Sequence, residues 1–77
     1  MTAELHQEVI LARDVPQHGL RAGDIGTVVH IYPKGAFEVE FFTASGKTRA
    51  VVTLSEAEVR LATDNDVIAV RRLDATG

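Results

Sequence analysis

Apolar and polar residues alternate most strictly over residues 36–42, which read AFEVEFF. In an extended chain the side chains of Phe37, Val39 and Phe41 lie on one face, and the two glutamates between them lie on the other. This period of two is typical of a β-strand with one buried face and one face in water. The pattern therefore predicts a strand that contributes two phenylalanines and a valine to a hydrophobic core.

Turn residues such as glycine, proline and aspartate recur roughly every 8–12 positions, a spacing typical of sandwiches and barrels. The apolar stretches between these turns predict four more strands, at residues 8–13, 26–32, 48–54 and 59–62. The sequence SEAE matches a capping box, in which Ser55 and Glu58 bond each other's backbone amides. Because the apolar pattern there is too short for a full helix, it predicts one 3₁₀ or helical turn before the fifth strand.

A chain of 77 residues with 45% hydrophobic side chains is typical of a single globular domain near the lower size limit for a self-sufficient core. We expect a tail at residues 1–7, an all-β barrel at residues 8–62 and a C-terminal extension at residues 63–77. Residues 67–73 of the extension allow two interpretations: a sixth strand on an open sheet edge, or an extended arm that pairs with another chain. The two arginines in this segment have an alternative role as charges that prevent edge-to-edge pairing.

The strand motif Gly26-x-Val28-x-x-Ile31, the alternating hairpin after it and the stretch AVVTLSEAEVRLA resemble the SH3-like barrels. Within that class they resemble the KOW-type barrels of transcription-elongation and ribosomal proteins, over residues 9–62. The resemblance implies a five-stranded SH3-like barrel with a short turn before the fifth strand. KOW barrels that bind RNA place lysines and arginines around the glycine-marked loop, whereas this loop has Arg21 beside Asp24.

The chain also resembles a family of small bacterial single-domain proteins of unknown function. The motifs that carry this resemblance are Arg13-Asp14-Val15-Pro16, His18-Gly19-Leu20, Gly23-Asp24-x-Gly26-Thr27-Val28-Val29 and Val51-Val52-Thr53-Leu54. The resemblance implies a compact stand-alone barrel that binds a partner rather than catalyses a reaction. It also implies that some members are encoded beside another small protein, which suits a partner-capping or antitoxin-like role.

The composition excludes several kinds of chemistry. The chain has no cysteine, which removes disulfides, thiolate metal ligands and thiol nucleophiles and fits a reducing cytoplasm. No segment resembles a secretory signal or approaches the roughly 18 apolar residues of a membrane span, so we expect a cytoplasmic protein without membrane contact. A formal charge of -3 opposes a broad phosphate-binding face.

No set of residues in the sequence predicts a catalytic or metal site. The histidines His6, His18 and His30 lie twelve residues apart, and no cysteine is present to complete a ligand set. Ser45 and Ser55 lack a neighbouring pair of histidine and carboxylate that could activate them. The two glutamates of the alternating strand are more simply explained by a solvated face than by acid–base catalysis. We therefore expect no enzyme activity, no metal and no cofactor.

Two surfaces are candidates for binding a partner. The first is the canyon that SH3-like barrels form between the excursion at residues 16–23 and the turn at residues 44–47, here with aromatic side chains on its floor. Phe42 has an alternative role as a cover for the barrel end. The second surface is an edge strand, either at residues 67–73 or along an exposed ladder, which suits β-addition. The candidate partner-binding residues are His18, Arg21, Tyr32, Phe42, Lys47 and Arg49.

The sequence favours a non-catalytic protein-binding module whose partner is another small protein, and it leaves a monomer and an edge-strand homodimer both open. The alternative is a KOW-like protein that binds RNA or DNA through Arg21, Lys34, Lys47 and Arg49 near the loop tips. The acidic net charge and the exposed glutamates oppose that alternative.

Overall fold

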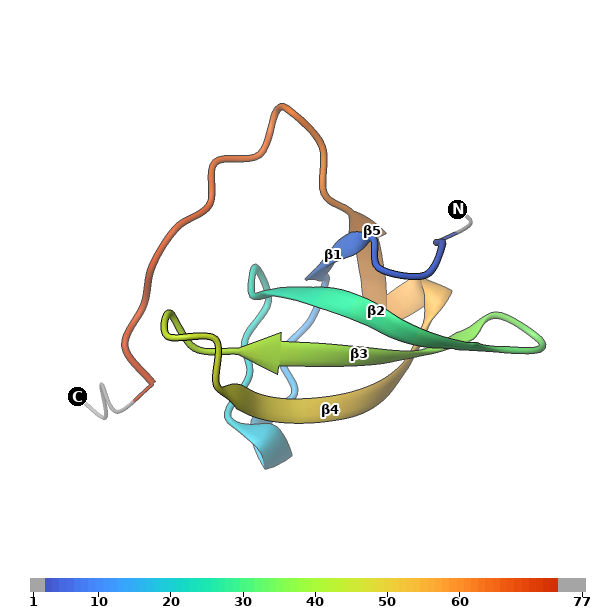
Figure 1. The fold of residues 1–77 in the computed structure, drawn as a ribbon, viewed down its shortest axis with the longest axis horizontal. Helices are drawn as coiled ribbons and strands as arrows, with labels where there is room; N and C mark the ends of the chain where they lie inside the picture. The colour runs from blue at the N-terminus through green and yellow to red at the C-terminus, as the bar shows by residue number, and fades with distance from the viewer. Residues whose placement is uncertain (1–2, 74–77) are drawn as a thin grey trace.

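The computed structural model describes residues 3–73 as one antiparallel sheet of five strands, in the order β4-β3-β2-β1-β5 (Figure 1). The elements are β1 (Glu8–Leu11), η1 (Pro16–His18), β2 (Ile25–Tyr32), β3 (Ala36–Phe42), β4 (Thr48–Ser55), η2 (Glu56–Glu58) and β5 (Val59–Leu61), where η is a 3₁₀ turn. The all-β class, with five strands and a 3₁₀ turn before the fifth, is confirmed. In residues 3–73 no ladder joins the edge strands β4 and β5, so a closed barrel stays a prediction.

The sheet is curved (Figure 1). The buried core takes side chains from all five strands. Phe37, Val39 and Phe41 are buried in it, which confirms the alternation of β3. On the opposite face, the two glutamates of β3 accept hydrogen bonds from the hydroxyl groups of Thr48 and Thr53 on β4. Each face of β3 therefore has the environment that its residues require.

Close contact between β2 and β3 depends on Gly26. A Cβ atom at this position would lie 2.6 Å from Val39 Cγ1 and 2.9 Å from Phe41 Cε2. Further along β2, a register shift between Val28 and His30 interrupts the ladder with β3. This bulge explains why the β-branched run of β2 does not alternate simply, because an extra residue bends the strand.

Four of the ten strand ends differ from the predicted ends by one or two residues. β1 ends at Leu11 instead of residue 13, because the Leu11 backbone bonds to Gly23 and Asp24, at 2.8 and 2.9 Å, as the chain enters the excursion that follows. β2 starts one residue early, β4 ends one residue late and β5 ends one residue early. The predicted capping box is present at η2, where the Ser55 amide donates to the Glu58 carboxylate at 2.8 Å.

The residues before β1 contact the sheet. Ala3 is part of the buried core, and the amide of His6 donates to the carbonyl of Val28 at 2.7 Å. The described part of the expected tail is thus attached to the sheet at Ala3 and at the His6 amide, while the side chains of residues 4–6 are exposed.

Residues 62–73, which we call the arm, follow β5 without forming a strand. Figure 1 shows the arm, in orange to red, leaving the end of β5 and running outside the sheet. No described backbone hydrogen bond connects residues 67–70 to the rest of residues 3–73. The sixth strand that the sequence left open at residues 67–73 is therefore absent, and the segment is an extended arm.

Candidate binding groove beneath the arm

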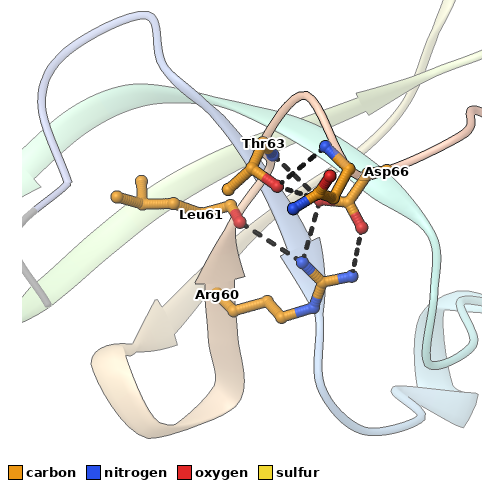
Figure 2. Close-up of polar contacts among 5 residues, drawn as sticks. Arg60, Leu61, Thr63 and Asp66 are labelled. Carbon is orange, nitrogen blue, oxygen red and sulfur yellow. Dashed lines mark hydrogen bonds and ion pairs between the residues drawn. The ribbon is translucent and has the colours of Figure 1, made fainter.

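A compact turn fixes the beginning of the arm. The Asp66 carboxylate accepts two hydrogen bonds from the Arg60 guanidinium, at 2.7 and 3.0 Å, and one from the Thr63 amide at 2.8 Å (Figure 2). Arg60 also donates to the carbonyl of Leu61 at 3.3 Å. The hydrogen bonds from Arg60, followed by those from Thr63, hold the pKa of Asp66 well below its usual range. A bidentate pair of this kind restricts both side chains to one geometry, so this first clamp sets the direction in which the arm leaves β5.

A second clamp ties the end of the arm to the turn before β2. Arg71 Nε and Nη2 donate to the two carboxylate oxygens of Asp24, at 2.8 and 2.5 Å, and Nη2 also donates to the carbonyl of Gly19 at 3.0 Å. The Arg21 amide donates to the same Asp24 carboxylate at 2.8 Å. Partial burial acts to raise the pKa of Asp24, but the hydrogen bonds from Arg71 and Arg21 outweigh it and leave that pKa below its usual value. The carboxylate therefore stays charged at neutral pH and holds the arm.

Between the two clamps the arm exposes apolar side chains. Val67 and Val70 are each 92% exposed and Ile68 is 73% exposed. Exposure of branched apolar side chains to water is unfavourable, and large exposed apolar patches are common at interaction sites. The two clamps thus hold a segment whose large apolar side chains are not buried by the rest of the described structure.

An open groove of about 1290 Å³ separates the arm from the sheet. Its sheet side combines the apolar residues Ile10, Ile25, Phe41 and Phe42 of β1, β2 and β3 with polar and charged residues such as Glu8, Thr27 and Arg49. Its other side is formed by the arm, both by the apolar residues 67–70 and by the charged residues that flank them. The volume exceeds the roughly 300–1000 Å³ of ordinary small-molecule pockets, and the groove is open to solvent rather than enclosed.

The structure places two of the sequence-predicted site residues in this groove. Phe42 is 49% exposed on its wall, and Arg49 lines it nearby. The Arg49 guanidinium also occupies the space beside Gly19, where an added Cβ would lie 2.8 Å from Nη2. The excursion after β1 and the start of β4 are therefore adjacent at Gly19 and Arg49, whereas the canyon between residues 16–23 and the turn at residues 44–47 stays a prediction.

The other four predicted site residues lie elsewhere. Arg21 lines a smaller hollow of about 310 Å³ beside the second clamp. Tyr32 is at the far end of β2, where its ring packs edge-on against His30 with centroids 4.6 Å apart. His18 in η1 and Lys47 in the β3–β4 turn are exposed and do not line the groove. The aromatic floor expected from Tyr32 and Phe42 together does not form around one site.

The residues of the two clamp ion pairs were not among the predicted site residues. They are Arg60, Asp66, Arg71 and Asp24. The Thr63-x-x-Asp66 spacing is a local signal for the first clamp, because a carboxylate three residues on can accept the amide of the residue that starts the turn. No local signal exists for Arg71 and Asp24, which are 47 positions apart.

The four basic residues of the nucleic-acid hypothesis do not share one face. Lys34 lies in the turn before β3 and Lys47 in the turn after it, so a whole strand separates them. Within residues 3–73, no group of three histidine, aspartate or glutamate side chains is arranged to hold a metal ion. The same part of the chain contains no helix long and apolar enough to cross a membrane.

Comparison with known families gives one match, to a domain of unknown function (DUF4926), over residues 5–61. The matched region contains all five strands and Asp24, and it ends at the last residue of β5, where the arm begins. No curated protein and no solved structure matches the chain.

Proposed function

The chain belongs to the DUF4926 family, and we propose that it is a non-catalytic protein-binding module that takes up an extended segment of a partner in the groove beneath its arm. The observation that carries this proposal is the groove itself, with half-exposed Phe42 on one wall and the apolar residues of the arm on the other. An apolar, open site of this size suits a polypeptide better than a small substrate.

The chemistry of the arm supports a partner that adds in an extended conformation. Residues 67–70 offer backbone donors and acceptors with no described partner, and β-addition satisfies such groups while side-chain pockets supply specificity. Both ends of the segment are already fixed, so binding costs less conformational entropy than for a free tail.

The broader parts of the proposal follow from the same features. We propose an SH3-like barrel of KOW type in the cytoplasm, whose curved sheet of five strands carries the groove. A partner segment held between arm and sheet is hidden from water and from other proteins, which is the physical basis of a partner-capping or antitoxin-like role.

A capture experiment with two matched variants tests the proposal. Tagged wild-type protein, Phe42→Ser and Tyr32→Ser are used as bait, and retained proteins are identified and quantified by mass spectrometry. Tyr32 is the control because it is a partly exposed aromatic residue outside the groove. We expect a stoichiometric partner on wild type and Tyr32→Ser and about tenfold less on Phe42→Ser, since buried aromatic anchors dominate binding. Equal retention by all three baits, or no stoichiometric protein on wild type, contradicts the proposal.

A further inference from the structure

Gly19 and Asp24 form a site that holds the guanidinium group of Arg71. Nε and Nη2 of Arg71 donate to the two carboxylate oxygens of Asp24, and Nη2 also donates to the carbonyl oxygen of Gly19. The fork of donors on a planar guanidinium matches the two oxygens of one carboxylate, whereas the ammonium group of a lysine is a point charge without this fork. The three acceptors are therefore arranged for a guanidinium group rather than for a cation of any shape.

The folded body arranges these acceptors without help from the arm. The Arg21 amide donates to the Asp24 carboxylate at 2.8 Å, and the Asp24 amide donates to the Arg21 carbonyl at 3.0 Å. Gly19 ends η1 in the left-handed conformation, with a φ of 69°. These three residues lie within residues 5–61, the part of the chain that matches the family, whereas Arg71 lies outside it. The site thus belongs to the five-stranded domain, and its occupant comes from the arm.

The charges near this site do not by themselves select its occupant. Asp14 and Arg21 line the same hollow as Arg71, and the Arg49 guanidinium lies close by, beside the end of η1. If Arg71 leaves, the carboxylates of Asp14 and Asp24 are balanced by the two remaining guanidinium groups. Selection therefore depends on the hydrogen-bond geometry of the three acceptors rather than on net charge.

The site can be reached from the groove beneath the arm. Asp24 lines the groove, Gly19 lines the smaller hollow beside it, and Arg71 lines both. The side chains of Asp24 and Arg71 are 18% and 28% exposed, so neither is sealed from solvent. The preceding residues 67–70 are exposed, and few contacts of their own are lost when Arg71 withdraws.

We propose that Gly19 and Asp24 form a receptor for an arginine side chain of the partner segment, and that Arg71 occupies this receptor in the free protein as a competing internal ligand. The inference rests on the proposed function, because it describes the partner segment bound in the groove as one that carries an arginine. The first clamp takes no part in the exchange, so the arm stays anchored at Asp66. Arg71 lowers the apparent affinity for the partner, because binding requires the receptor to be vacant.

Titration with N-acetyl-arginine amide tests the receptor without a partner protein. The readout is the NMR shift of the Arg21 amide, which donates to the Asp24 carboxylate. In Arg71→Gln the receptor is vacant, and we expect a saturable shift with a midpoint at least about tenfold lower than in wild type, where Arg71 competes at high effective concentration. N-acetyl-lysine amide at the same ionic strength is expected to bind more weakly, because it lacks the fork. Equal midpoints in the two proteins, or equal binding of the two probes, overturn the proposal.

Two further variants assign the binding to Asp24. Arg71→Gln combined with Asp24→Asn is expected to show no saturable shift. Arg13→Gln, the matched control, removes an arginine that pairs with Glu58 and lines neither the groove nor the hollow, so it is expected to titrate like wild type. Saturable binding to the double variant, or a lowered midpoint in Arg13→Gln, contradicts the receptor. The titration uses no partner protein, so its failure and the failure of the Phe42-dependent capture are separate results.

Discussion

Gly26 leaves no room for a side chain between β2 and β3. The nearest atoms to its missing Cβ belong to Val39 and Phe41, two of the three core residues of β3. We expect Gly26→Ala to lower the free energy of unfolding by about 1–3 kcal/mol, because overpacking forces core side chains or backbone to move. Urea denaturation measures the loss.

A double-mutant cycle tests whether Val39 is the side chain that an alanine at position 26 would clash with. Val39→Ala removes the methyl carbon closest to the new Cβ, so Gly26→Ala is expected to cost less in the Val39→Ala background than in wild type. Additive losses contradict a steric cause at Val39.

The carboxylate of Asp24 gives the second clamp a defined pH dependence. Its pKa in the folded chain lies below the usual value of 3.8. The clamp therefore contributes fully above that value and is lost as the pH falls through the lower folded pKa. We expect the NMR shift of the Arg21 amide, which donates to Asp24, to titrate with a midpoint below 3.8. A midpoint above 3.8, or the same titration in Asp24→Asn, contradicts this assignment.

At the scale of the elements, the strands could be predicted because each depends on local patterning. β3 alternates strictly and its bounds were predicted correctly, whereas β1 ends early at contacts with a loop twelve positions further on. The path of the arm depends on the ion pair between Arg71 and Asp24, and no local pattern relates two residues so distant in sequence. Phe42 and Arg49 could therefore be predicted as binding residues from the sequence, whereas the position of the arm opposite them in the groove could not.

Loss of the second clamp should make the arm more mobile and leave the sheet folded. We expect Arg71→Gln to lower the heteronuclear NOE of the amides in residues 67–70, because the far end of the arm is then released from Asp24. The NOE of β3 should not change, since no core residue contributes to the clamp. Arg13→Gln, which removes an ion pair with Glu58 outside the residues that line the groove, is the matched control. Equal NOE values in Arg71→Gln and wild type contradict the clamp.

For the whole molecule, the distribution of charge separates the two candidate functions. Basic side chains lie at both ends of β3, and the chain carries a formal charge of -3. We expect no binding of RNA or DNA in fluorescence anisotropy at about 50 mM salt, where phosphate contacts are strongest. Salt-sensitive binding that is lost on replacing Lys47 and Arg49 instead favours the nucleic-acid alternative.

The five-stranded sheet and the arm are separate parts of the molecule. The family match ends with β5, and the arm begins at the next residue. The sheet supplies a stable body of five strands, and the two clamps use residues of that body to hold an otherwise unpaired segment beside it.

Hydrogen exchange of the arm amides in dilute, monomeric protein tests the central claim most directly, namely that residues 67–70 are held clear of the sheet. The account predicts that Ile68, Ala69 and Val70 exchange at nearly unprotected rates, while the β3 amides, paired on both sides, are protected from exchange. It also predicts that the three arm amides gain protection when a partner chain binds. Protection of these amides in the monomer to the level of β3 would contradict the account, because it would mean that the arm is a strand of its own sheet.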